Sequence, residues 1–258
     1  MIGELGLWLK SKFRDFLYAC GFLLNVLKES LLFLRQRQVG FRVLVLQILF
    51  TAVEALGIVS LISLALGAVI IVQGVSILPK FGQGQLLYTI LIIVITRELG
   101  PILTAFIIIA RSGTAIATEL GNMVISHEIE AYLSVGINPI SYLVVPRFLA
   151  VTVSMLLLTF YFNFLGLFGS FFITQLISPI QFGEYFRNLL SSLQVVDIVS
   201  SIIKSTVFGI IISFTAIYQG FKVQASSTEI PQVAIKAVGQ GFVFCILADA
   251  VITLIYYL

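Results

Sequence analysis

The chain has 258 residues, of which 59% are hydrophobic and only 10% are charged, with a net charge of +3. A soluble domain averages about 25% charged residues, so this chain has too few polar side chains to cover a water-soluble globule. We therefore expect an integral membrane protein. The apolar runs are long and do not alternate with a period of two, which favours an all-α protein over a β-barrel. No basic cluster indicates nucleic-acid binding.

The N-terminal 42 residues have an amphipathic pattern. Apolar side chains recur at helical spacing between Leu5 and Leu27, and most Lys and Arg residues fall elsewhere on the helix. This pattern predicts a helix that lies in the membrane interface, with Trp8 at headgroup depth. A signal peptide is the alternative, because residues 16–27 are long enough for its apolar region. Residues 28–30 follow without a small-x-small cleavage site, which favours the interfacial helix.

Apolar runs after residue 42 predict about five transmembrane helices. The first run covers residues 43–78 and is longer than a bilayer core requires. It is either one steeply tilted helix or an interfacial lead-in followed by a span from about residue 53. The other spans are expected at about residues 86–110, 143–177, 198–218 and 238–257.

The distribution of Lys and Arg predicts the orientation. With the N-terminus in the cytoplasm, the opposite side of the membrane carries only Lys80 and Arg187 outside the spans. Because cytoplasmic loops are enriched in Lys and Arg, we expect the polar segment 111–141 in the cytoplasm and the C-terminus on the other side. The sequence contains no phosphate-binding loop, no Ser/His/Asp arrangement and no metal-ligand spacing, so we expect neither an enzyme nor a cofactor.

Two pairs of charged residues lie well inside the predicted spans, where an unpaired charge costs several kcal/mol. Arg97 and Glu98 are either satisfied by helix contacts or form part of a substrate-cavity wall. Adjacent residues on a helix point about 100° apart, so these two need not pair. Lys204 and Asp249 are the only full charges in their spans and have opposite signs. A buried ion pair between the fourth and fifth spans is the simplest interpretation, and a part in a conformational switch is the alternative.

The segment 111–141 is polar, yet it also contains Ile116, Leu120, Met123 and Ile129. These side chains are too apolar for a free loop. We expect a helix–turn–helix unit that packs on the membrane or on a partner. His127 is the only histidine, and no metal site is predicted around it.

Two stretches carry a resemblance to a known family. RELGPILTAFIIIARSGTAIATELGNM at residues 97–123 and GINPISYLVVPRFLA at residues 136–150 resemble the MlaE (YrbE) family of ABC-transporter permeases. The similarity extends over nearly the whole chain. It implies a single permease domain over residues 1–258, with an interfacial region at 1–42 and a transmembrane region at 43–258.

The resemblance also implies partners and a cargo. Such permeases form homodimers with two cytoplasmic ATPase subunits and an MCE-domain lipid-binding protein on the far side of the membrane. The implied cargo is a phospholipid or a related lipid, and ATP hydrolysis is expected on the partner chain. The implied location is the bacterial inner membrane, with the plastid inner envelope as the alternative.

Site residues follow from the matched positions. The family's lipid cavity lies at the dimer interface, and the positions that match it here are Ile70, Gln73, Leu78, Phe81, Arg97 and Glu98. A cytoplasmic coupling helix is implied at about residues 117–133 within the segment 111–141, with Glu119, Gly121, Met123, Glu128 and Glu130 as matched positions. Lys204 and Asp249 match charged positions of the later spans.

Two other functions compete with this one. An ion-coupled secondary transporter would use Glu54, Glu98 and Asp249 as coupling carboxylates, but it would need inverted repeats, and the two halves of the sequence show no convincing repeat. A purely structural membrane anchor predicts that substitutions of Arg97 and Glu98 are tolerated.

Overall fold

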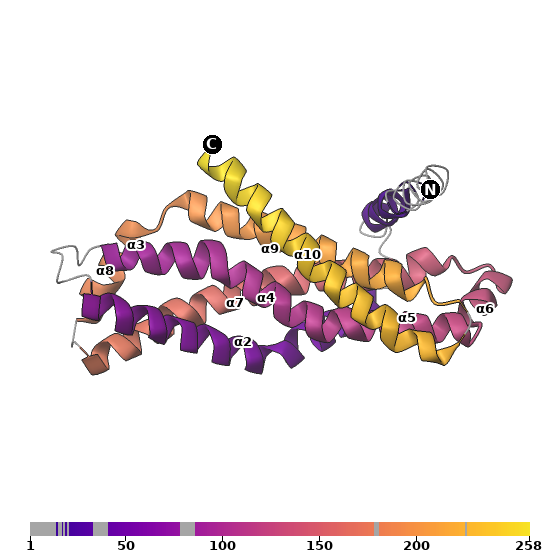
Figure 1. Ribbon diagram of the computed structural model, residues 1–258, viewed down its shortest axis with the longest axis horizontal. Helices are drawn as coiled ribbons and strands as arrows, with labels where there is room; N and C mark the ends of the chain where they lie inside the picture. The colour runs from indigo at the N-terminus through magenta and orange to yellow at the C-terminus, as the bar shows by residue number, and fades with distance from the viewer. Residues whose placement is uncertain are drawn as a thin grey trace, which may run out of the picture.

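The computed structural model describes residues 14, 17, 19, 21–32, 41–77, 86–177, 181–224 and 226–258. The described residues form helices and short connections, with no strand among them. Long helices lie side by side along the longest axis of the molecule (Figure 1). Five of them are long and apolar enough to cross a membrane, which confirms the expected all-α membrane fold.

The first and third spans are long helices that pack on each other. The first is the single helix α2 (Phe41–Ile77), so the interpretation with one continuous helix is the one that the structure supports. The third consists of η4 (Ile140–Val144) and α7 (Val145–Ile177). Gly67 of α2 and Gly166 of α7 face each other so closely that a Cβ on Gly67 would lie 2.6 Å from the Gly166 carbonyl oxygen. Small residues at such crossings let membrane helices interlock.

The second span is a helix with two π-helical segments, and it extends beyond its predicted end. Its parts are α3 (Leu86–Ile92), η2 (Ile93–Leu99), α4 (Gly100–Ile108), η3 (Ile109–Gly113) and α5 (Thr114–Ile125). The predicted end at residue 110 is therefore wrong. Ile116, Ala117 and Leu120 are buried where α5 packs against the last two spans. The apolar residues that looked unusual for a loop thus extend the bundle.

The fourth and fifth spans are α9 (Val195–Gly220) and α10 (Ile230–Tyr257). The fifth begins earlier than predicted, after the short η5 (Ser227–Glu229), because Pro231 lies in the first turn, where its missing N–H costs no helical hydrogen bond. α10 is held to α9 in part by polar contacts, including a hydrogen bond of 2.6 Å from Gln219 Nε2 to Gln240 Oε1. Much of its remaining surface is apolar and exposed.

Two short helices connect the spans at opposite ends. α6 (Glu128–Ser134) follows the second span, and α8 (Phe182–Ser192) lies between the third and fourth spans. Tyr185 of α8 is fully buried, and its hydroxyl lies 2.9 Å from Ser170 Oγ of α7. Burial raises the pKa of Tyr185 to about 12, so the phenol keeps its proton for this hydrogen bond.

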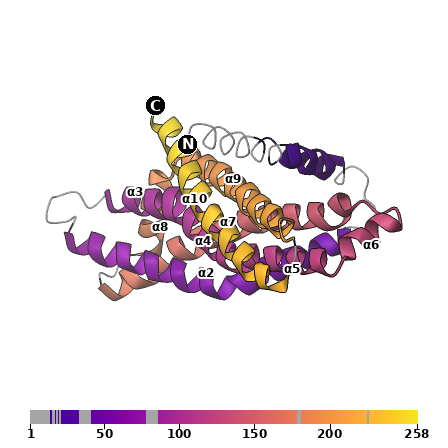
Figure 2. The same cartoon turned by 45° about the vertical axis from the view of Figure 1, so that its right-hand side comes forward.

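In the N-terminal region, residues 21–32 form a helix beside the bundle, in the half that carries α6 (Figure 2). Its Phe22 ring lies 6.2 Å from the rings of Phe214 and Phe221 near the end of α9. Leu24 and Leu31 are exposed, as expected for a helix at a membrane interface. Trp8 lies outside the described residues.

We predict that Gly209→Ala destabilises the fold by about 1–3 kcal/mol, because overpacking in a tight core costs that much. A Cβ on Gly209 would lie 2.8 Å from the Thr152 Cα, which is backbone of α7 and cannot move aside. Gly57→Ala is the matched control, because a Cβ there meets nothing within 4 Å. Thermal unfolding in detergent measures both. Equal melting temperatures for the two variants would contradict the close α7–α9 packing.

Candidate functional site

Five charged side chains from three spans form what we call the intramembrane charge cluster: Arg97, Glu98, Asp197, Lys204 and Asp249. Lys204 of α9 is fully buried at its centre. Its Nζ lies 2.5 Å from Glu98 Oε2 of η2 and 2.9 Å from Asp249 Oδ1 of α10. The sequence predicted the Lys204–Asp249 pair, and the structure adds Glu98 as a second partner. One lysine thereby ties the second, fourth and fifth spans together.

Arg97 occupies the other side of the cluster. Its side chain is buried, with Nη1 3.7 Å from Asp197 Oδ1 and Nε 3.6 Å from Glu98 Oε1. The guanidinium also lies 3.4 Å from the centre of the Tyr256 ring, at cation–π distance. Arg97 and Glu98 therefore touch each other, but each also has a partner on another span.

Asp197 is a cluster member that the sequence analysis missed. It lies in the first turn of α9, where its Oδ2 accepts a hydrogen bond of 3.0 Å from the Gln194 backbone N–H as part of a capping box. The sequence signal is the Gln-x-x-Asp spacing at a helix start. That signal predicts a cap, but it does not reveal that the second carboxylate oxygen faces Arg97.

The π-helical segment η2 determines where Arg97 and Glu98 point. The Gly100 N–H bonds to the Ile95 carbonyl, five residues back. Pro101 follows and has no N–H to offer the preceding turn, which favours a departure from regular α-helix. A Cβ on Gly100 would collide with Ile95 O and with Asn163 Oδ1 of α7, so only glycine fits here. The Gly-Pro pair thus sets the geometry of the charges beside it.

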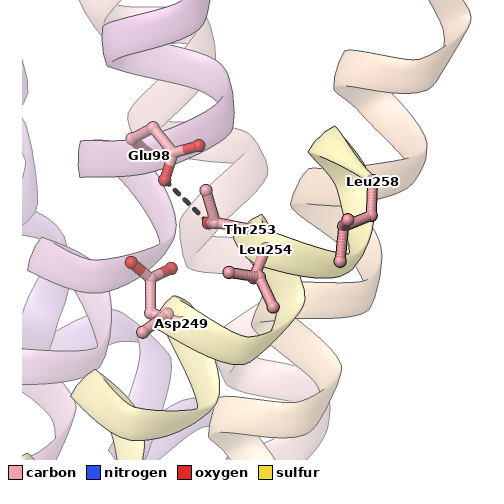
Figure 3. A pocket seen from close by; sticks show the side chains of 6 residues that line it. Glu98, Asp249, Thr253, Leu254 and Leu258 are labelled. Carbon is pink, nitrogen blue, oxygen red and sulfur yellow. Dashed lines mark hydrogen bonds between the residues drawn. The ribbon is translucent and has the colours of Figure 1, made fainter.

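A cavity of about 410 Å³ opens beside the cluster (Figure 3). Its wall combines Glu98 and Asp249 with Ala250, Thr253, Leu254 and Leu258. Thr253 Oγ1 donates a hydrogen bond of 3.3 Å to Glu98 Oε2. The Glu98 and Asp249 side chains are 27% and 20% exposed, whereas Lys204 is 1% exposed and lies behind them. The cavity therefore has a charged end and an apolar end, which suits an amphipathic molecule.

The other cavity residues implied by the family resemblance lie elsewhere. Ile70 of α2 is partly buried against the core, and Gln73 is exposed on the same helix. Neither is among the residues that line the cavity in this single chain. Leu78 and Phe81 lie outside the described residues.

The implied coupling helix over residues 117–133 is divided in the structure. α5 ends at Ile125, and His127 adopts a left-handed conformation with φ 57° before α6 begins. Glu128 and Glu130 are exposed on α6, and Glu130 Oε2 lies 2.9 Å from His127 Nδ1. These carboxylates are presented at the tip of the bundle (Figure 1), where another protein can reach them.

The three matched positions on α5 have internal contacts. Glu119 Oε1 accepts a hydrogen bond of 2.6 Å from Arg147 Nη2, which joins α5 to α7. Gly121 is buried, and a Cβ there would lie 3.0 Å from a Val223 methyl group. Met123 packs against the core. These positions hold the helix that leads to α6.

Glu54 does not belong to the charge cluster. Its Oε2 lies 2.6 Å from Arg111 Nη2, which joins α2 to η3. The three carboxylates that a secondary transporter would use are therefore split between two groups, since Glu98 and Asp249 share Lys204. Among the described residues, no group of three His, Cys, Asp or Glu residues could hold a metal ion.

Comparison with known proteins identifies the family. The family model described as Permease MlaE matches residues 44–255. The chain belongs to the MlaE permease family. A Haemophilus influenzae relative, the intermembrane phospholipid transport system permease protein MlaE, is 26% identical over 244 residues, 94% of each chain. A probable ABC transporter permease protein of Rickettsia prowazekii is 27% identical over 211 residues, 82% of each chain.

A plant relative extends the comparison. The chloroplastic protein TRIGALACTOSYLDIACYLGLYCEROL 1 of Arabidopsis thaliana is 28% identical over 207 residues, 80% of this chain and 59% of that protein. The resemblance to the MlaE family read from the sequence is confirmed. This permease is a multi-pass membrane subunit that works with a separate ATPase, and it is not itself an enzyme.

We predict that Lys204→Gln destabilises this permease by about 3–5 kcal/mol, because it leaves two partly buried carboxylates without their shared cation. Adding Asp249→Asn should recover part of that loss, since one carboxylate is then neutral. Thermal unfolding in detergent measures the single and double variants, with the exposed Lys236→Gln as control. Strictly additive losses in the double variant would contradict the Lys204–Asp249 contact.

Proposed function

We propose that this permease is the membrane subunit of an ABC transporter that moves a phospholipid or a related lipid between membranes. The observation that carries the proposal is the cavity at Glu98 and Asp249, which pairs carboxylates with Leu254 and Leu258. A phospholipid has the same division into a polar headgroup and apolar chains. The Haemophilus relative, named as an intermembrane phospholipid transport permease, supports the same cargo class.

In this proposal two copies form a homodimer, with an ATPase on each copy and an MCE-domain protein on the far side. The exposed surface of α10 supports the dimer, because only 11% of its most apolar stretch of 18 residues is buried within one chain. Val243, Leu247 and Leu254 lie exposed along it. A second copy against this face would enclose the cavity, and the exposed Gln73 of α2 is available to line an enlarged site.

The ATPase moves α6, and the second span transmits this movement to the cavity. From Ile125 back to Glu98 the second span has no loop, and at 1.5 Å per residue this stretch is roughly 40 Å long. A displacement of α6 is therefore transmitted along the helix that carries Glu98. The π-helical segments η2 and η3 are the places along it where the turn geometry departs from α-helix.

The proposed location is the bacterial inner membrane with α6 in the cytoplasm. The Arabidopsis relative, named as chloroplastic, makes the plastid inner envelope the alternative. The rival secondary transporter is disfavoured by the Glu54–Arg111 pair, which separates Glu54 from the cluster. The rival structural anchor is disfavoured by the charged end of the cavity, because an anchor has no need of buried charges in its spans.

We predict that purification in mild detergent yields a stoichiometric ATPase together with bound phospholipid, identified by mass spectrometry. Ala250→Trp places a large side chain in the cavity wall and should reduce the bound phospholipid severalfold while the ATPase is retained. Leu157→Trp is the control, because Leu157 is exposed on α7, outside the cavity lining and outside the proposed dimer face. A lone protein without an ATPase would argue for the secondary transporter. A complex without phospholipid, or equal lipid in both variants, would refute the proposed cargo site.

We predict that Glu128→Lys combined with Glu130→Lys weakens co-purification of the ATPase at least severalfold, because both exposed carboxylates of α6 reverse their charge. Glu184→Lys on α8 is the control, since α8 lies toward the other end of the bundle (Figure 1). Unchanged ATPase recovery with the double variant would exclude α6 as the docking element.

A further inference from the structure

A second cavity of about 420 Å³ lies in the half of the molecule that carries α6. Three parts of the chain that are far apart in the sequence form its wall. The N-terminal helix contributes Phe22, α6 contributes Ile129 and Leu133, and the end of α9 contributes Tyr218, with Phe221 and Lys222 directly after it. Residues 138–140 close the remaining side. Its volume falls in the usual range of ligand pockets, roughly 300–1,000 Å³.

The chemistry of this cavity suits an anion with an apolar part. Lys222 is the charged residue of its lining, and no carboxylate lines it among the described residues. The Lys222 ammonium lies 4.5 Å from the centre of the Tyr218 ring, which positions it by a cation–π contact. The rest of the wall is largely aromatic and aliphatic.

Two nearby acidic side chains have hydrogen-bond or ion-pair partners of their own. Glu29 of the N-terminal helix accepts a hydrogen bond of 2.8 Å from Ser141 Oγ. Glu130 of α6 lies 2.9 Å from His127 Nδ1. Neither of them, nor the exposed Glu128 of α6, lines the cavity. The helix that begins with Ile140 adds the positive end of its dipole on the same side.

The position of the cavity selects the kind of anion. The N-terminal helix exposes Leu17, Leu24 and Leu31 together with Arg14 and Lys28, a combination typical of a helix lying at a membrane surface. The excess of Lys and Arg assigns this side to the cytoplasm. Anionic lipids are enriched in the cytoplasmic leaflet, where each Lys or Arg near the surface contributes about 1 kcal/mol to their binding.

We infer that this cavity binds an anionic phospholipid of the cytoplasmic leaflet, with its phosphate at Lys222 and its apolar part against Phe22 and Phe221. The site is separate from the cargo cavity at Glu98 and goes beyond the transport function. A lipid there contacts the N-terminal helix and α6 at once. It therefore stabilises the position of α6, the element through which the ATPase acts, and makes that position sensitive to lipid composition.

The test measures lipid binding to the full-length permease. The protein is purified, stripped of lipid in detergent and titrated with phosphatidylglycerol or phosphatidylcholine, with native mass spectrometry to count bound lipids. Lys222→Gln should weaken phosphatidylglycerol binding about fivefold, the change that corresponds to about 1 kcal/mol. Lys236→Gln removes an equal charge from α10 outside the cavity and should leave binding unchanged. Leu133→Trp, which fills the cavity at an exposed position, should lower binding without removing a charge.

Each outcome decides the inference. Weaker phosphatidylglycerol binding in both Lys222→Gln and Leu133→Trp, with binding unchanged in Lys236→Gln, supports the lipid site. The same loss when Glu98→Gln is also present shows that the site is distinct from the cargo cavity. The inference is overturned if phosphatidylglycerol and phosphatidylcholine bind equally well. It is also overturned if Lys222→Gln and Lys236→Gln lower phosphatidylglycerol binding equally. Weaker ATPase recovery in Lys222→Gln with phosphatidylglycerol binding intact also overturns it, because the cavity would then serve a protein contact.

Discussion

The buried ammonium of Lys204 is the constraint on which this structure depends. A lysine in the interior of a membrane protein must find anionic partners, because its charge is otherwise too costly there. Glu98 and Asp249 supply them, and each comes from a different span. The second, fourth and fifth spans must therefore meet at one height. The cavity beside the cluster follows from the same contact, since both carboxylates that bind Lys204 also face the open space.

The π-helical turn at η2 and the Gly-Pro pair after it allow the second span to place its charges against the fourth and fifth spans. A regular α-helix would point Arg97 and Glu98 in other directions relative to α9 and α10. The inserted residue lets Arg97 reach Asp197 while Glu98 reaches Lys204. Such segments are frequent at functional sites because they re-aim side chains within an otherwise continuous helix. Here the departure from regular geometry and the charged end of the cavity coincide.

The sequence predicted the membrane class, the five spans and the Lys204–Asp249 pair, because apolar run length and isolated opposite charges are visible along the chain. It did not predict the roles of Asp197 or of Glu98 as a bridge, since both depend on which helices lie side by side. The helix–turn–helix unit expected within residues 111–141 is present as α5 and α6. The position of its turn at His127 was not predicted, because a positive φ at a residue other than glycine leaves no clear sequence signal. The cavity at Lys222 joins the N-terminal helix, α6 and the end of α9, and no local pattern reveals such a meeting.

The attachment of α10 differs in kind from that of α2. Gly67 and Gly166 interlock α2 with α7 through backbone contact, and such a contact fits in one register only. Two polar contacts hold α10, from Asp249 to Lys204 and from Gln240 to Gln219. Apolar packing also holds its inner face, including the fully buried Cys245, while its outer face is apolar and exposed. Polar side-chain contacts can break and form again with new partners when one helix shifts slightly along another. Helices joined by close backbone contact must separate before they can shift. The first and third spans are therefore fixed to each other by backbone contact, whereas the helix that carries most of the cavity lining is held by side-chain contacts that can exchange partners.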